Sequence, residues 1–272
     1  MDLLPYYCVG HRADNFRWFA KSLATLRRCN PEIPVAVLCD RDMGVDDPAT
    51  TVYRWPMRTV LDSMIARAFI LEVLPRAPAR LLYLDTDTAV SQPFRLMVDQ
   101  CRLPGFWATI EPKMACYIGS EVSGKYAMTP AEVAKATALA NRVGSACSGV
   151  WYTDATTAAR LFKDWAVETY MMAARHPGMV ERGDWRTGDQ ATLNALIWRG
   201  RLKVDAADWS IMRPFAPPYH YYRPTRAPVV GHFAGDISVK RHIWSYPGVP
   251  IPLRFPEGQD PFEDELVASA VA

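Results

Sequence analysis

The segment that most constrains the fold is a short apolar run, residues 81–84, that ends in two carboxylates, Asp85 and Asp87. A continuous apolar run is typical of a parallel strand buried on both faces, and a buried helix segment fits the run as well. In an extended chain, residues i and i+2 point to the same side, so the two carboxylates are expected to lie close together. Like charges at that distance repel unless a cation lies between them. The alternative is that Asp85 caps a turn and Asp87 faces water.

The surrounding segments alternate between strand and helix patterns. Strands are expected at 5–11, 33–40 and 80–85, and helices at 14–29 and 62–74. This order is typical of right-handed crossovers in a parallel sheet. Ligands of such sheets bind at the carboxyl ends of the strands, which is where Asp85 and Asp87 fall.

The remaining segments continue the alternation without an internal repeat or a clear linker. Strands are expected at 105–111, 147–154, 201–208 and 227–233, and helices at 129–144, 155–178 and 188–200. The Pro-rich stretch 213–228 is expected to form a loop. We therefore expect an α/β fold with a single mixed, mostly parallel sheet flanked by helices, in one domain over residues 1–256. The tail 257–272 carries five acids and no base and is expected to fray.

Composition excludes several classes of protein. The 31 Lys and Arg residues and the 29 Asp and Glu residues give a formal charge of +2. This balance lacks the excess of positive charge that is typical of proteins that bind nucleic acid. The six cysteines have no CxxC spacing, so we interpret them as reduced thiols of a cytoplasmic protein, although their even count leaves a secreted protein as the alternative. No apolar run approaches the roughly 18 residues of a membrane helix. A soluble protein is expected, for which peripheral membrane contact stays open.

A histidine extends the pair of acids into a candidate metal site. His232 ends a late strand in the sequence "GHFAG". Two carboxylates and one imidazole are suited to Mn²⁺ or Mg²⁺ that holds the phosphates of a substrate. A metal in that place neutralises a diphosphate leaving group. The alternative for His232 is a hydrogen-bonded histidine of the core.

Four regions, in order along the chain, resemble the nucleotide-sugar glycosyltransferases of the GT-A fold, especially the retaining glycogenin and galactosyltransferase-like group (glycosyltransferase family 8). They read "HRADNF" (11–16), "ARAFILEVLPRAPARLLYLDTDTAV" (66–90), "CSGVWYTD" (147–154), and "GDQATLNAL" (188–196) followed by "GHFAGDISVKRHIW" (231–244). The resemblance implies a GT-A, Rossmann-like sheet. It also implies a metal held by Asp85, Asp87 and His232.

The resemblance further assigns the residues that would contact the donor. Asp14 and Asn15 would contact the base or ribose, Arg67 the donor sugar or diphosphate, and Lys240 the diphosphate. Asp14 alternatively caps its helix, whereas Arg67 on an otherwise apolar helix face is harder to explain by structure alone.

The same resemblance places four residues around the transferred sugar. Ser148 and Gly149 would line it, and Asp189 and Gln190 would lie beside the anomeric carbon. Asp189 also begins a helix, where an acid is favourable in any case. It suits either a retaining or an inverting mechanism, and the resemblance favours retention.

Three features depart from the family pattern. Cys147 stands where the family usually has Asn, and the gap between Gly235 and Lys240 is longer than usual. The stretch 113–146 has no counterpart in the family and is a candidate for part of the acceptor site. A cluster of aromatic residues either stacks on a sugar acceptor or packs within its loop; it comprises Trp209, Phe215, Tyr219, Tyr221 and Tyr222.

The expected function is metal-dependent transfer of a sugar from a nucleotide-diphosphate sugar, with UDP favoured, to a hydroxyl of a carbohydrate or glycoconjugate acceptor. One alternative is a catalytically silent sugar- or nucleotide-binding module of the same fold. Another is a metal-dependent nucleotidyl- or phosphotransferase, although the chain has no GxxxxGK[ST] phosphate loop.

Overall fold

The computed structural model describes residues 2–10, 12–111, 145–175, 189–214, 227–233 and 240–256, with four single positions between 130 and 138. Most of the helix expected at 129–144, most of the loop at 213–228, and the whole tail 257–272 lie outside the described residues.

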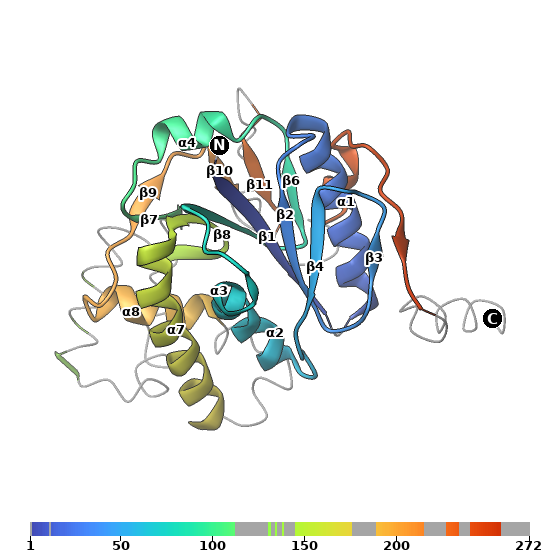
Figure 1. The fold of residues 1–272 in the computed structure, drawn as a ribbon. Helices are drawn as coiled ribbons and strands as arrows, with labels where there is room; N and C mark the ends of the chain where they lie inside the picture. The colour runs from blue at the N-terminus through green and yellow to red at the C-terminus, as the bar shows by residue number, and fades with distance from the viewer. Residues whose placement is uncertain are drawn as a thin grey trace.

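A seven-stranded sheet forms the centre of the molecule, with strand order β4-β2-β1-β5-β8-β7-β9 (Figure 1). The strands are β1 (Leu3–Val9), β2 (Val35–Cys39), β4 (Thr50–Arg54), β5 (Arg80–Leu84), β7 (Phe106–Glu111), β8 (Ser145–Asp154) and β9 (Asp205–Ala207). All neighbouring pairs are parallel except β5–β8 and β8–β7, which are antiparallel. This arrangement confirms the expected mixed, mostly parallel sheet.

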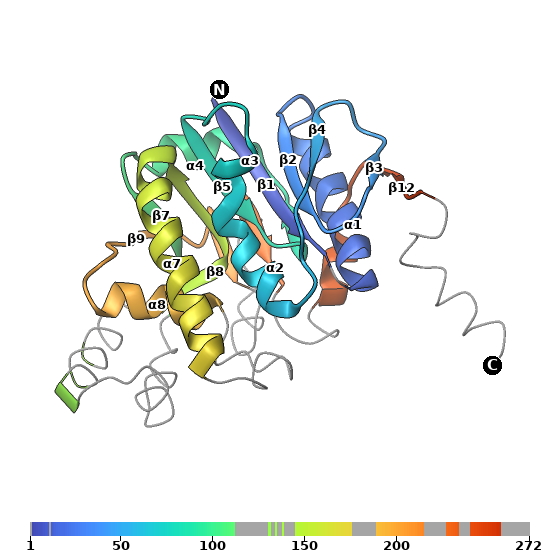
Figure 2. The same ribbon diagram turned by 60° about the horizontal axis from the view of Figure 1, so that its bottom comes forward.

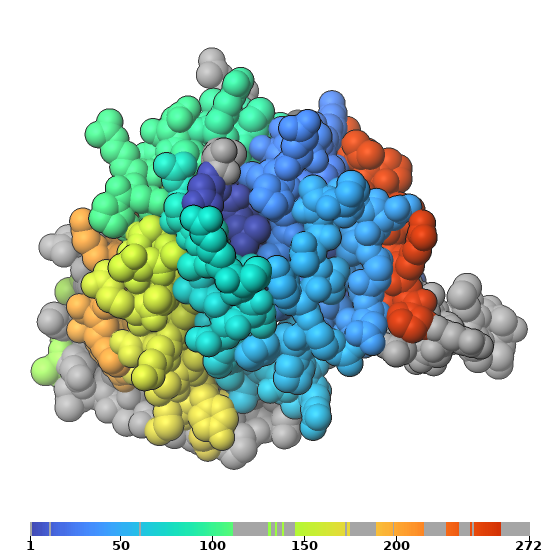
Figure 3. Space-filling view, in the orientation of Figure 1, coloured from blue at the N-terminus to red at the C-terminus, as the bar shows by residue number. Residues whose placement is uncertain are grey.

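Helices cover both faces of this sheet, which is why strands β1 and β2 are apolar throughout. Along β1, Tyr7 and Val9 belong to one core while Tyr6 and Cys8 belong to the other. One face packs against α1 (Ala13–Cys29) and α4 (Arg95–Gln100); the other packs against α2 (Val60–Ala66), α3 (Ile70–Val73), α7 (Ala155–Arg175) and α8 (Asp189–Trp198). Figure 2 shows α2 and α7 on the second face, and Figure 3 shows α7 beside the α2–α3 segment over it.

Two smaller sheets that the sequence did not predict complete the described part of the fold. One has the order β10-β11-β6 and contains β10 (Met212–Pro214), β11 (Val230–His232) and β6 (Thr88–Val90). The other pairs β12 (Leu253–Arg254) with β3 (Gly44–Val45). Because β6 follows β5 after a short turn, its pairing with β11 places His232 opposite Thr88, next to the two acids.

The helix expected at 62–74 is interrupted at its centre. It begins with a capping box of Thr59 and Asp62, changes to a 3₁₀ turn at η1 (Arg67–Phe69), and resumes as α3. Such mid-helix 3₁₀ turns often mark functional positions, and this one carries Arg67. The strand expected at 201–208 is shorter in the structure, where β9 spans only Asp205–Ala207. Among the described residues, no helix combines the length and apolar character needed to cross a bilayer.

Candidate active site

Asp85 and Asp87 lie in the turn that joins β5 to β6. The expectation that they continue an extended strand is therefore wrong. Backbone contacts fasten the turn: the N–H of Asp85 donates to the carbonyl of Gly149 (2.8 Å), and the N–H of Phe233 donates to the carbonyl of Asp87 (3.0 Å). The hydroxyl of Thr88 donates to the carbonyl of Asp85 (2.8 Å). The turn thus ties β5 to β8 and to the residue after β11.

The expected metal-binding residues meet at this turn. His232 Nε2 lies 3.5 Å from Asp85 Oδ2 and 3.3 Å from Asp87 Oδ1. One ligand atom from each of the three residues lies within 4.8 Å of the other two. Gly149 borders the cluster so closely that a Cβ at its position would collide with the His232 ring and would lie 2.6 Å from Asp85 Oδ2. A glycine is therefore required where β8 passes these ligands.

The ionisation of the cluster is set by its own members. Burial opposes the charge of Asp87, but His232 and Lys240 outweigh it and hold the pKa of this carboxyl well below its usual range. Lys240 Nζ lies 2.8 Å from Asp87 Oδ2, and this contact raises the pKa of Lys240 although burial lowers it. Burial likewise lowers the pKa of His232, but Cys147, Asp85 and Asp87 raise it above its usual value by a larger amount.

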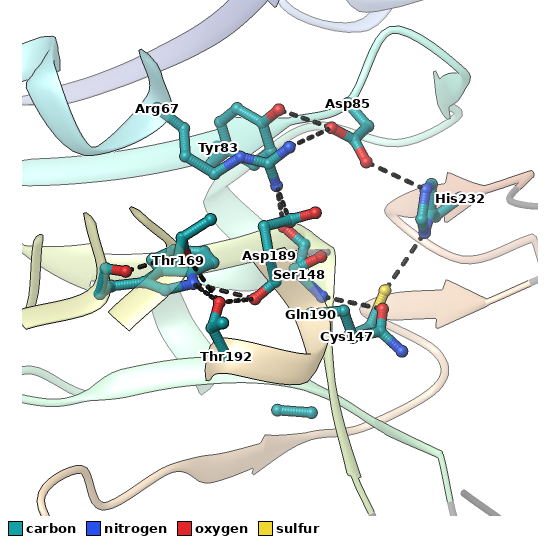
Figure 4. A network of polar contacts seen from close by, with 12 residues as sticks. Arg67, Tyr83, Asp85, Cys147, Ser148, Thr169, Asp189, Gln190, Thr192 and His232 are labelled. Carbon is teal, nitrogen blue, oxygen red and sulfur yellow. Dashed lines mark hydrogen bonds and ion pairs between the residues drawn. The ribbon is translucent and has the colours of Figure 1, made fainter. Parts of the chain in front are cut away.

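Arg67 connects this cluster to α8. Its Nη1 lies 2.7 Å from Asp189 Oδ2 and donates to the carbonyl of Ser148 (3.0 Å), while Nη2 lies 3.5 Å from Asp85 Oδ1. Figure 4 shows the guanidinium between the two carboxylates. The group is buried and lies 4.5 Å from the centroid of the Tyr83 ring. The apolar helix face around Arg67 thus carries it to the carboxylates of Asp85 and Asp189, while its expected contact with the donor stays a prediction.

Tyr83 also belongs to this network, although it is not among the residues predicted from the sequence. Its hydroxyl donates to Asp85 Oδ1 at 2.5 Å, so Oδ2 remains the oxygen that faces His232. Burial is the largest cause of the raised pKa of Tyr83, which keeps this hydroxyl protonated as a donor. Its position two residues before Asp85 was the available signal, because residues i and i+2 of a strand share a side.

A wide irregularity in β8 shapes the other wall of the site. Between β7 and β8, Ala108 pairs with Trp151 but Ile110 pairs with Ala146, so residues 147–150 oppose Thr109 alone. Side chains of α8 hold this bulge. Asn194 donates to the carbonyl of Ala146 and accepts from its N–H, both at 2.8 Å, and Gln190 Oε1 accepts from the N–H of Ser148 (3.3 Å). Bulges often lie beside active sites, where they redirect side chains.

Comparisons with known proteins bear on this geometry. No family model matches the chain, and no curated protein matches it. Among solved structures, the galactosyltransferase LgtC in complex with donor and acceptor sugar analogs is 13% identical, with 89% of this chain and 94% of that one covered at a TM-score of 0.54. GlyE of Streptococcus pneumoniae TIGR4 is 13% identical over 90% of this chain and 60% of its own, at 0.55. Mouse xyloside xylosyltransferase 1 is 12% identical, and the match covers 87% of this chain and 98% of that one at a TM-score of 0.51.

The chain has the fold of the GT-A glycosyltransferases. At these identities the likeness establishes the fold, and the chemistry depends on the chain's own residues. Within this GT-A fold, the acids follow β5, His232 ends β11, and Asp189 begins α8. Three elements far apart in the sequence therefore supply one constellation.

The GT-A fold does not bring every expected donor contact into that constellation. Asp14 and Asn15 lie in the first turn of α1, where Asn15 Nδ2 donates to the carbonyl of Gly10 (2.8 Å) and Asp14 lies 3.8 Å from Arg12. Among the described residues, no hydrogen bond or ion pair joins either side chain to the cluster. Of the expected aromatic group, Trp209 is described and lies 5.5 Å from the Arg213 guanidinium; Phe215, Tyr219, Tyr221 and Tyr222 lie outside the described residues, as does Gly235.

The residues present at this candidate site fit a divalent cation. Asp85, Asp87 and Asp189 carry three negative charges and Arg67 and Lys240 two positive ones, so the site is net negative when His232 is neutral. Carboxylate oxygens with one imidazole nitrogen are ligands that suit Mn²⁺ and Mg²⁺. The glycine at position 149 also leaves the space beside these ligand atoms unfilled by a side chain.

Proposed function

We propose that this protein is a metal-dependent glycosyltransferase. It would move a sugar from a nucleoside-diphosphate sugar, with UDP as the favoured nucleotide, to a hydroxyl group of a carbohydrate or glycoconjugate. The observation that carries the proposal is the convergence of Asp85, Asp87 and His232, with ligand atoms within 4.8 Å of one another, beside Arg67 and Asp189 in a GT-A fold. LgtC, which has this fold, was solved with donor and acceptor sugar analogs.

In this proposal Asp85, Asp87 and His232 hold Mn²⁺ or Mg²⁺. When bound, the cation neutralises charge on the diphosphate leaving group. Lys240 lies at the edge of the cluster on Asp87 Oδ2 and would supply further positive charge to the diphosphate. Asp14 and Asn15, in the first turn of α1 after β1, would contact the base or ribose.

Arg67, Ser148, Gly149, Asp189 and Gln190 would surround the transferred sugar. Arg67 holds Asp189 at 2.7 Å, and Gln190 is fixed through the N–H of Ser148, so both α8 side chains have defined positions. A carboxylate or amide oxygen held beside the anomeric carbon suits a transfer that retains its configuration. We assign this role to Asp189 and Gln190.

We also propose that residues 1–256 form one GT-A domain in a cytoplasmic protein, with the acidic tail 257–272 outside it. Free cysteines are typical of reducing compartments. The five cysteines that the structure describes, Cys8, Cys29, Cys39, Cys101 and Cys147, are free thiols.

A hydrolysis and transfer assay tests the proposal. The protein would be incubated with UDP-, GDP- and TDP-linked sugars and Mn²⁺, with release of the nucleotide as the readout, and the anomeric configuration of the product would be read by NMR. Metal-dependent release from one donor class, lost in Asp189→Ala, supports a transferase. Metal-dependent nucleotide binding without release from any donor would favour the silent binding module.

A further inference from the structure

The two ring nitrogens of His232 face different partners. Nε2 faces the acids, at 3.3 Å from Asp87 Oδ1 and 3.5 Å from Asp85 Oδ2. Nδ1 lies 3.2 Å from the sulfur of Cys147. Figure 4 shows the imidazole between Asp85 on one side and Cys147 on the other. The side chain of His232 is 7% exposed and Cys147 is 1% exposed, so both contacts are sheltered from water.

The position of the sulfur follows from the bulge in β8. The bulge comprises residues 147–150 of β8, which have no regular partners in β7. Cys147 is the first residue of this bulge, and Gly149 is the third. A Cβ at position 149 would collide with Cε1 and Nε2 of the His232 ring, so the backbone of β8 packs directly against the ring there. The same short stretch of backbone therefore contacts the ring at Gly149 and places a polarisable atom at Nδ1.

Imidazole chemistry gives this contact a direction. A neutral imidazole carries its hydrogen on one nitrogen and a lone pair on the other, and a cation binds through the lone pair. If Nε2 is the nitrogen that binds the cation, Nδ1 carries the hydrogen and needs an acceptor. Partners of this kind orient metal-binding histidines and are usually carboxylates, carbonyls or waters. In the part of the chain that the structure describes, the atom within hydrogen-bond distance of Nδ1 is the sulfur of Cys147, at 3.2 Å.

We propose that Cys147 is a positioning residue for the metal site, with its sulfur accepting the Nδ1–H of His232 and thereby presenting the Nε2 lone pair to the cation. The inference rests on the proposed function, because it assumes that His232 is a metal ligand. It gives a role to the residue at which this chain departs from the resembling family.

Metal affinity measured without any substrate tests the inference. Free Mn²⁺ would be quantified by electron paramagnetic resonance during titration of the unmodified protein, Cys147→Ala, Cys147→Ser and Cys101→Ala. Loss of an outer partner of a metal-binding histidine typically weakens metal binding about tenfold or more. We expect that loss in Cys147→Ala and most of the affinity restored in Cys147→Ser, whose hydroxyl also accepts. Cys101→Ala removes an equally buried thiol from the core and should leave the affinity unchanged.

A second readout reports the tautomer itself. Long-range ¹H–¹⁵N correlation spectra with Mg²⁺ present would show the hydrogen of His232 on Nδ1 in the unmodified protein and a mixture of tautomers in Cys147→Ala. Unchanged Mn²⁺ affinity together with an unchanged tautomer in Cys147→Ala would overturn the inference while leaving the proposed function intact. Failure of the unmodified protein to bind Mn²⁺ would overturn both.

Discussion

Arg67 is the residue on which the charges of the site converge. Its guanidinium pairs with Asp189 at 2.7 Å and reaches Asp85 at 3.5 Å, while its side chain is 8% exposed. Burial opposes its charge, but Asp189 and its other neighbours raise the pKa of Arg67 above its usual value. Arg67 therefore stays charged, and it compensates carboxylates that would otherwise be desolvated without a partner.

Removing the Arg67 guanidinium alone should destabilise the fold more than removing both charges of the Arg67–Asp189 pair. We expect Arg67→Met to lower the free energy of unfolding by about 3 kcal/mol, because Asp189, whose side chain is only 14% exposed, is left without its partner. The double variant Arg67→Met/Asp189→Asn should recover a large part of that loss. Urea unfolding of both single variants and the double variant measures the coupling, and strictly additive losses would contradict it.

Gly149 is the second residue whose identity the site dictates. A methyl group at this position would overlap the His232 ring, so Gly149→Ala should displace a proposed metal ligand and weaken Mn²⁺ binding at least tenfold, as losses at metal-orienting positions typically do. Gly44→Ala is the matched control, because its new Cβ would make an ordinary 3.5 Å contact with Arg254. Calorimetric titration with Mn²⁺ measures both affinities. Equal affinity of Gly149→Ala and Gly44→Ala would show that the ring is not displaced.

At the scale of elements, α7 depends on a carboxylate at its beginning. Asp154 directly precedes the helix; its Oδ1 accepts from the N–H of Thr157 (2.8 Å) and its Oδ2 from the Thr157 hydroxyl (2.7 Å). Burial alone would raise the pKa of Asp154, but these bonds and one from Gly105 hold it below its usual value. Asp154 therefore belongs to the fold as a helix cap, and the site depends on it only through α7.

The pH dependence of this cap has a definite sign. Because the folded pKa of Asp154 lies below the unfolded one, its contribution is complete above the unfolded value, near 4, and disappears as pH falls through the folded value. Asp154→Ala should cost about 1 kcal/mol at neutral pH, and the deficit should shrink in acid. Asp99→Ala, an exposed acid on α4, is the control. Denaturant unfolding at several pH values would contradict the assignment if the deficit grows in acid.

Elements differ in how well the sequence predicts them, and burial explains the difference. Strands β1, β2 and β5 were predicted within a few residues because burial on both faces leaves a continuous apolar run. Strand β4 was missed because it lies at the sheet edge, where residues such as Thr51 and Arg54 are exposed. The short strands β6 and β10 were missed because each has three residues, too few for any periodicity to appear, whereas β11 lies within the strand expected at 227–233.

The site was predicted in part, for a related reason. Asp85, Asp87 and His232 could be proposed from residue type and from the ends of expected strands. Asn194 could not, since its role depends on the bulge in β8; the spacing of Tyr83 from Asp85 was a signal, but its contact also depends on the turn after β5. Both features arise from pairings between strands distant in sequence.

For the molecule as a whole, the alternation of strands and helices predicted an α/β sheet but not its strand order. The antiparallel strand β8 lies between β5 and β7, although it follows β7 in the sequence by more than 30 residues. That insertion brings the bulge at 147–150 beside the acids after β5. The site is thus a property of the complete sheet.

If this sheet assembles a metal-dependent site for a nucleoside diphosphate, the protein should bind UDP only together with the cation, which calorimetric titration of UDP with Mn²⁺ or with EDTA measures. We expect binding only when Mn²⁺ is present, with the binding lost in Asp87→Ala and kept in Asp99→Ala. Equal binding of UDP with EDTA, or binding by Asp87→Ala as tight as that of the unmodified protein, would contradict it.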